Sequence, residues 1–129
     1  MELKFNRDHI HIRCQDFDGA VAWYENVLCA KVVTRGEVPG MPIVRLDLGG
    51  EIIALSPKRE GMEVEPLSGR PRWGCWQIAF NVTDLEQTYL ELKARGAEFE
   101  IAPFQQTPQW KAAFLKAPDG VQVELIQYT

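Results

Sequence analysis

The chain has 129 residues, of which 46% are hydrophobic and 25% charged, and its formal net charge at pH 7 is -4. This length and composition fit a globular domain and exclude a disordered chain. The acidic balance argues against nucleic-acid binding, which needs clustered Lys and Arg. No apolar run approaches the roughly 18 residues of a membrane-spanning helix, and the first residues lack a signal-peptide core. We therefore expect a cytoplasmic protein that has neither a membrane nor a nucleic acid as its partner.

Three cysteines occur along the chain, at Cys14, Cys29 and Cys75. Their number is odd, their spacing is wide, and no pair has the CxxC spacing of metal or redox motifs. We expect reduced and mostly buried thiols in a reducing compartment.

The first half of the chain is predicted to fold as a βαβββ module at about residues 6–56. A short alternating segment from His9 leads to Asp16, whose carboxylate is suited to cap a helix over residues 17–28. The strands predicted after this helix are residues 30–36, 43–48 and 51–56. The last two are joined by a tight turn at Gly49-Gly50. Residues 57–73 are rich in Pro, Gly and charge, which predicts a connecting loop.

The second half, at about residues 74–128, repeats this order. An alternating segment from Gln77 leads to Asp84 and a helix over residues 85–95, which Gly96 ends. The strands predicted after this helix are residues 97–104, 111–116 and 121–128. A turn at residues 117–120 takes the place of Gly49-Gly50, and the TPQW stretch at residues 107–110 is expected to be an irregular loop.

The two halves can be laid over each other residue by residue. Ile10 then matches Ile78, Asp16 matches Asp84, and Gly50 matches Gly120. This internal repeat predicts an α+β fold of two tandem βαβββ modules within a single domain, residues 1–129. We expect the two modules to face each other across a small-molecule pocket.

Strand alternation separates an apolar face from a polar face in both modules, because successive side chains point to opposite sides. The polar side chains assigned in this way are His9, His11, Arg13, Gln77, Asn81 and Glu124. Three strands that repeat the pattern predict a shared polar cavity. Arg13, Arg45 and Asn81 are candidates to hold a carboxylate or phosphate, although a solvated position explains Arg45 equally well. Trp110 is expected to stack on a planar ligand, whereas the parity of Trp76 predicts core packing.

The order of these segments resembles the vicinal oxygen chelate superfamily, which includes glyoxalases, bleomycin resistance proteins and extradiol dioxygenases. The matching stretches are DHIHI and AVAWYENVL, then QIAFNVTDLEQTYLELKARGAEFE, and finally AAFLKAPDGVQVELIQ. The resemblance implies a glyoxalase-like domain, a half-open mixed-sheet barrel around a central cavity, and a homodimer.

The resemblance also implies a candidate metal site. The family's ligand positions fall on His9 in the first module and on Gln77 and Glu124 in the second, whereas Ala54 occupies a fourth position. Zn, Ni, Mn or Fe is then the expected cofactor, and His11 is a further candidate ligand because an H-x-H pair on a strand can chelate one ion. The alternatives are that His11 only forms hydrogen bonds within the cavity and that Glu124 is a buried carboxylate paired with Arg13 or His9.

Two functions stay open. In the first, the protein is a divalent-metal-dependent lyase or isomerase acting on a substrate with neighbouring oxygens, and Glu124 moves the proton. In the second, it is a metal-free protein of the bleomycin-resistance type that sequesters a drug or metabolite, which Ala54, Gln77 and the tryptophans support. Gln77 argues against an extradiol dioxygenase, because a second-module His is expected there.

Overall fold

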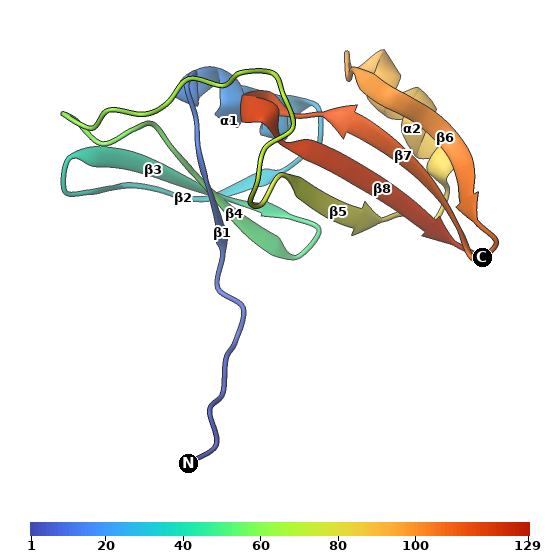
Figure 1. Ribbon diagram of the computed structural model, residues 1–129, viewed down its shortest axis with the longest axis horizontal. Helices are drawn as coiled ribbons and strands as arrows, with labels where there is room; N and C mark the ends of the chain where they lie inside the picture. The colour runs from blue at the N-terminus through green and yellow to red at the C-terminus, as the bar shows by residue number, and fades with distance from the viewer. The chain divides into compact units, whose positions relative to one another are not determined.

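The computed structural model describes residues 1–129 and divides them into two units. The first unit comprises residues 1–25 and 29–64, and the second comprises residues 26–28 and 65–129. The chain forms two four-stranded mixed sheets and two α-helices (Figure 1). The predicted α+β class, with two tandem βαβββ modules, is therefore confirmed.

The elements of the first unit follow the predicted order. They are β1 (Ile10–Arg13), α1 (Phe17–Asn26), β2 (Lys31–Val38), β3 (Met41–Leu48) and β4 (Glu51–Ser56). The sheet order is β1-β4-β3-β2, in which β1 pairs with β4 in parallel and the other pairs are antiparallel. Gly49 and Gly50 both have positive φ, 61° and 85°. Such angles favour glycine and form the tight turn that the sequence predicts.

The second unit repeats this arrangement. Its elements are β5 (Gln77–Asn81), α2 (Leu85–Ala94), β6 (Phe99–Thr107), β7 (Trp110–Lys116), η1 (Pro118–Gly120) and β8 (Gln122–Tyr128). The sheet order is β5-β8-β7-β6, with β5 and β8 parallel. Asp119 and Gly120 have φ values of 63° and 73°, so this turn adopts positive φ at two successive residues, as Gly49 and Gly50 do.

The strand registers confirm the residue-by-residue overlay of the two halves. Ile10 pairs with Ile53 in the first sheet, and Ile78 pairs with Val123 in the second. The overlay matches Ile10 to Ile78, so Ile53 corresponds to Val123. It follows that Ala54 and Glu124 occupy equivalent positions.

Both helices begin at the predicted aspartates. The Oδ1 atom of Asp16 accepts a hydrogen bond from the backbone N–H of Gly19 at 3.0 Å, and that of Asp84 accepts one from Gln87 at 3.0 Å. Each bond satisfies an N–H group that has no partner within the helix. A Cβ atom at Gly19 would meet the Asp16 carboxylate, so a larger residue at this position would displace the capping group.

One face of each sheet carries the apolar core. The buried strand residues on these faces include Val44, Leu46, Ile53 and Leu55 in the first sheet, and Ile78, Leu115, Val123 and Leu125 in the second. Helix α2 packs on β6, β7 and β8 (Figure 1), and Tyr89 of α2 meets Phe99 edge to face, with ring centroids 4.7 Å apart. Burial of apolar side chains such as these is the main force that holds each unit together.

Several local predictions were wrong. Residues 107–110 are not an irregular loop, because Thr107 pairs with Trp110 and strand pairing continues to a two-residue turn. Strands β2 and β3 likewise extend to the turn at residues 39–40. Cys29 and Cys75 are exposed, and only Cys14 is buried. Trp76, which directly precedes β5, is 52% exposed instead of packed in the core.

Neither helix of the structure has the length and apolar character needed to cross a membrane. Residues 1–9 form no helix or strand and lead into β1 as an extended, exposed segment (Figure 1).

Candidate functional site

The face of the first sheet opposite the apolar core carries a row of side chains that we call the first central row. Cross-strand pairing places His11 of β1 opposite Ala54 of β4, Ala54 opposite Arg45 of β3, and Arg45 opposite Thr34 of β2. Side chains of residues paired in this way lie on the same face of a sheet. The turn at residues 49–50 fixes the register of β3 and β4, and with it the position of Arg45.

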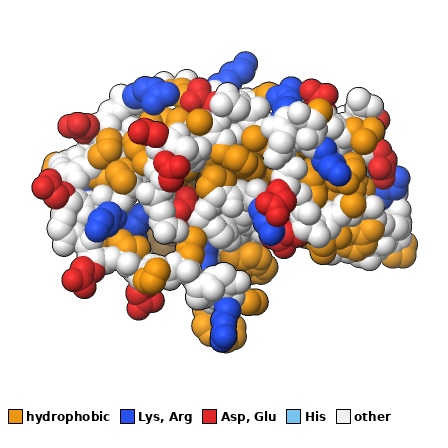
Figure 2. Space-filling model, turned by 90° about the horizontal axis from the view of Figure 1, so that it is seen from above, with side chains coloured by type: hydrophobic (Ala, Val, Ile, Leu, Met, Phe, Trp, Pro, Cys, Tyr) orange, Lys and Arg blue, Asp and Glu red, His pale blue; other side chains and the backbone are white.

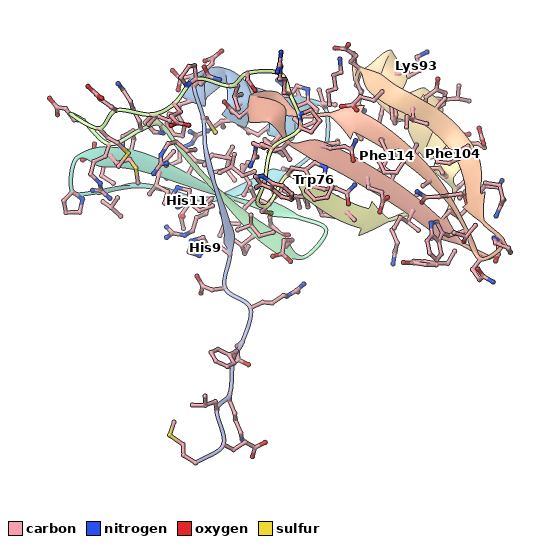
Figure 3. The ribbon with its side chains drawn as sticks, viewed as in Figure 1. His9, His11, Trp76, Lys93, Phe104 and Phe114 are labelled. Atoms are coloured by element: carbon pink, nitrogen blue, oxygen red, sulfur yellow. The ribbon has the colours of Figure 1, made fainter.

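His11 is held by a buried hydroxyl group. Its Nε2 atom lies 2.7 Å from Oγ of Ser56, which is 1% exposed. The ring of His9 is nearby, with centroids 6.0 Å apart, and its Nδ1 atom lies 2.5 Å from a carboxylate oxygen of Asp8. Figure 3 shows both imidazoles on the same side of β1. Each imidazole therefore has one ring nitrogen engaged within the protein.

The surroundings of His11 disfavour its protonated form. Burial lowers the pKa of His11 from its ordinary value of 6.5, and the positive charges of His9, Arg13 and Arg45 lower it further. In one tautomer of the neutral ring, Nε2 accepts the Ser56 proton and the Nδ1 N–H is a donor; in the other, Nε2 donates to Ser56 and Nδ1 is an acceptor. His11 can thus present either a hydrogen-bond donor or a base at Nδ1 near neutral pH.

The face of the second sheet opposite its core carries the corresponding second central row. Ala79 of β5 lies opposite Glu124 of β8, Glu124 opposite Phe114 of β7, and Phe114 opposite Ile101 of β6. Phe104 extends the apolar area, with its ring centroid 6.2 Å from that of Phe114. Figure 3 shows these two phenylalanines on neighbouring strands. Glu124 is therefore a carboxyl group flanked by apolar side chains.

This apolar setting changes the acidity of Glu124. Burial raises its pKa from the ordinary value of 4.5, because a carboxylate loses hydration next to apolar groups. Ile101 and Phe104 nevertheless remain 46% and 38% exposed. Apolar side chains with this much exposure, placed beside one carboxyl group, can bind an apolar molecule that also donates a hydrogen bond.

The remaining predicted residues of the second unit lie on this same face. Gln77 donates from Nε2 to Oε1 of Gln122 at 2.7 Å. Asn81 is exposed at the end of β5. Trp110 begins β7, where its indole N–H donates to Oε1 of Gln106 at 2.7 Å and its ring meets Tyr128 edge to face. The structure thus groups the predicted site residues by unit, and their roles stay predictions.

The metal hypothesis needs ligands from both units. Within neither unit do three or more His, Cys, Asp or Glu side chains form a group that could hold a metal ion. Ala54 provides no donor, whereas Gln77 donates from Nε2 to Gln122, and this bond does not use the carbonyl oxygen that would bind a metal ion. The residues of one unit alone therefore do not fit a metal centre, and the set of His9, Gln77 and Glu124 stays a prediction.

Sequence reasoning missed several neighbours of the predicted residues, namely Ser56, Ile101, Phe104, Phe114 and Gln122. A signal for Phe114 existed, because the turn at residues 117–120 sets the β7–β8 register and places Phe114 opposite Glu124. On the face shown in Figure 2, acidic and basic side chains are interspersed, and no broad basic area is visible.

Comparison with known proteins identifies the family. Residues 6–125 match the model of the Glyoxalase/Bleomycin resistance protein/Dioxygenase superfamily. Among solved structures, a glyoxylase/bleomycin resistance protein/dioxygenase domain from Frankia sp. EAN1pec is 21% identical, with a TM-score of 0.77 and coverage of 98% of this chain and 100% of that chain. A glyoxalase family protein from Enterococcus faecalis is 22% identical, with a TM-score of 0.76 and coverage of 95% and 97%.

A third similar structure is the virulence protein STM3117 from Salmonella typhimurium, which is 24% identical with a TM-score of 0.71. That match covers 99% of this chain and all of the other. At these identities the solved structures show the shared fold, and the family model extends over almost the whole sequence. The chain therefore belongs to the Glyoxalase/Bleomycin resistance protein/Dioxygenase superfamily.

Proposed function

We propose that this protein binds a small organic molecule on the second central row, without needing a metal ion. The observation that carries the proposal is the second central row, in which Glu124 lies between Phe114 and Ala79. Exposed apolar side chains supply contact area, and a single carboxyl group supplies orientation, which is the usual composition of a small-molecule site. Small-molecule binding is also typical of the superfamily.

The chemistry of Glu124 narrows the class of ligand. A carboxyl group that is partly removed from water gains most from a partner that donates a hydrogen bond or carries positive charge. The exposed ring of Phe104, which packs beside the buried ring of Phe114, favours a planar ligand, because aromatic rings contact each other in offset or edge-to-face geometry. We therefore expect an aromatic compound that bears a hydroxyl or amino group.

Binding of a matched pair of probes tests this proposal. We expect 4-methylphenol to shift the backbone amide resonances of Phe114 and Glu124 in NMR titrations, and 4-methylanisole, which lacks the donor proton, to bind more weakly. Glu124→Gln should weaken binding of the phenol about tenfold. Phe104→Ala should weaken both probes, because both lose the same ring contact.

Two control variants belong to the same experiment. Glu91→Gln removes a carboxylate on helix α2, and Leu90→Ala removes an apolar side chain that is 61% exposed there. Neither should change binding, because α2 packs on the other face of the sheet. Equal affinity of the phenol for the parent protein and the Glu124→Gln variant would contradict the proposal.

A second function has a specific observation in its favour. His9 and Glu124 occupy two positions that metal-dependent relatives use for ligands, and simple sequestration requires neither. In this alternative, the protein is a divalent-metal-dependent lyase or isomerase. His9, Gln77 and Glu124, with His11 as a further donor, would hold the ion, which would act as a Lewis acid on neighbouring substrate oxygens.

Metal binding by protein without a His-tag distinguishes the two functions. The metal-free proposal predicts no stoichiometric uptake of Zn, Ni, Mn or Fe in calorimetry. The enzyme proposal predicts one ion per chain, and it predicts that His9→Ala and Glu124→Ala each lose most of it. Full retention of metal by both variants would show that the ligands are elsewhere.

A further inference from the structure

Two arginines of the first unit, Arg13 and Arg45, have no acidic partner. Arg13 and Arg45 lie on the same face of the first sheet as His11, and no ion pair or hydrogen bond occupies either guanidinium group. Arginines on a sheet are commonly paired with carboxylates or spread over solvated positions. Here two of them flank one partly buried imidazole.

The nearby acids are already engaged elsewhere. Asp47 follows Arg45 on the same face, but its Oδ1 atom accepts the backbone N–H of Gly50 at 3.0 Å. Asp8 is bound to His9, and Glu51 forms an ion pair with Arg7 at 2.8 Å. The arginines of this face therefore keep their donor groups available for an external anion.

The spacing of these donors suits one small anion. His11 and Arg45 lie on strands that both neighbour β4, so their Cα atoms are roughly 10 Å apart, twice the spacing of adjacent strands. Arg13 lies two residues beyond His11 on the same edge and opposite Ser56. Long arginine side chains can converge over the intervening Ala54, and a guanidinium group matches the geometry of carboxylate and phosphate oxygens.

We propose that Arg13, Arg45 and the outward ring nitrogen of His11 form an oxyanion subsite on the first sheet, which binds the carboxylate or phosphate group of a small molecule. This inference goes beyond the proposed function, which concerns the second central row. Ser56 is a positioning residue, since its buried hydroxyl holds the imidazole.

Titration with inorganic phosphate, at an ionic strength kept constant with sodium chloride, tests the subsite directly. We expect saturable shifts of the Arg13 and Arg45 Nε–Hε resonances in NMR spectra of the full chain. Arg13→Gln and Arg45→Gln should each weaken phosphate binding about tenfold or more, and Arg45→Lys should weaken it less because it keeps the charge.

Arg35→Gln is the matched control. Arg35 belongs to the same sheet, but it forms an ion pair with Glu25 of helix α1 at 3.7 Å, on the face that carries the core. Its removal should leave phosphate binding unchanged. Equal weakening by Arg35→Gln, or unchanged binding in both Arg13→Gln and Arg45→Gln, would overturn the subsite.

A second probe pair separates this inference from the proposed function. Phenylacetate should bind more tightly than phenylacetamide, and Arg45→Gln should remove that difference. If the two compounds bind equally and Arg45→Gln affects neither, small-molecule binding stands and the oxyanion subsite is wrong. If phosphate binds through Arg13 and Arg45 but no organic probe binds, the subsite is an inorganic-anion site and the proposed function fails.

Discussion

The two units place opposite chemistry on equivalent backbone positions. In the first central row the larger polar groups are His11 and Arg45, and the residue between them is Ala54. In the second central row the pattern is inverted, since Glu124 occupies the position of Ala54 and is flanked by Ala79 and Phe114. One row is cationic, and the other combines a carboxyl group with apolar side chains.

This difference shows which parts of a duplicated module are constrained. The core faces must stay apolar and the turns must keep their positive φ angles, because both determine strand register. On the opposite faces the chemistry differs at equivalent positions, as Ala54 and Glu124 show. The pKa values follow, since burial and neighbouring cations lower that of His11, whereas burial raises that of Glu124.

The largest expected effect tests whether the cores of the two units contribute equally to the free energy of unfolding. Leu46 and Leu115 occupy equivalent positions, opposite Ile53 and Val123, and both are fully buried. Leu46→Ala and Leu115→Ala should each lower the free energy of unfolding by about 2–5 kcal/mol, because each leaves a cavity in a packed core. Urea denaturation followed by circular dichroism measures both values.

Leu90→Ala serves as the control for this pair, because Leu90 is 61% exposed on α2. Its effect should stay within about 0.5 kcal/mol. A loss in one unit of less than about 1 kcal/mol would break the equivalence of the cores, because a buried Leu→Ala change costs more than that.

Smaller effects are expected at the helix caps. Asp16→Ala and Asp84→Ala should each cost about 1 kcal/mol, because each leaves a backbone N–H of the first helical turn without its acceptor. Gly19→Ala should cost less than Asp16→Ala: the new Cβ atom displaces the capping carboxylate, but the higher helix propensity of alanine offsets part of that loss. Gln87→Ala, at the equivalent position of α2, should keep its cap, and thermal unfolding measures the contrast. Equal losses of stability in Gly19→Ala and Gln87→Ala would contradict this role of Gly19.

The smallest expected effect is on the pH dependence of the free energy of unfolding, to which His11 and Glu124 should contribute with opposite signs. The folded-state pKa of His11 lies below 6.5, so the unfolded chain binds this proton first, and stability is lost as pH falls from about 6.5. The folded-state pKa of Glu124 lies above 4.5, so the folded chain holds this proton more tightly, and stability is lost as pH rises from about 4.5.

Denaturation at a series of pH values checks both signs. His11→Gln should flatten the stability curve just below pH 6.5, and Glu124→Gln should flatten it just above pH 4.5. If the contributions of His11 and Glu124 to the free energy of unfolding changed with pH in the same direction, the two rows would not differ as described.

Local sequence determined much of this protein. The repeat, the capping aspartates, the turns at residues 49–50 and 117–120, and the two faces of each sheet could all be predicted. Each of these features depends on residues close together in the chain, through side-chain periodicity, backbone φ preference or a hydrogen bond within one turn. The assignment of Ala54 and Glu124 to equivalent positions followed from the same signals, and the strand registers confirm it.

Only the tertiary structure decided which side chains meet. Ser56 holds His11 across 45 residues of sequence, Gln122 bonds to Gln77, and Phe114 flanks Glu124. The tertiary structure also decided which side chains are exposed. Trp76, for example, was expected in the core and is exposed. These contacts depend on strand pairing between distant segments, and alternation along one strand gives the face of a residue but not its neighbours. The sequence therefore specified where polar chemistry lies, and the folded sheets determined that one face is cationic and the other aromatic and acidic.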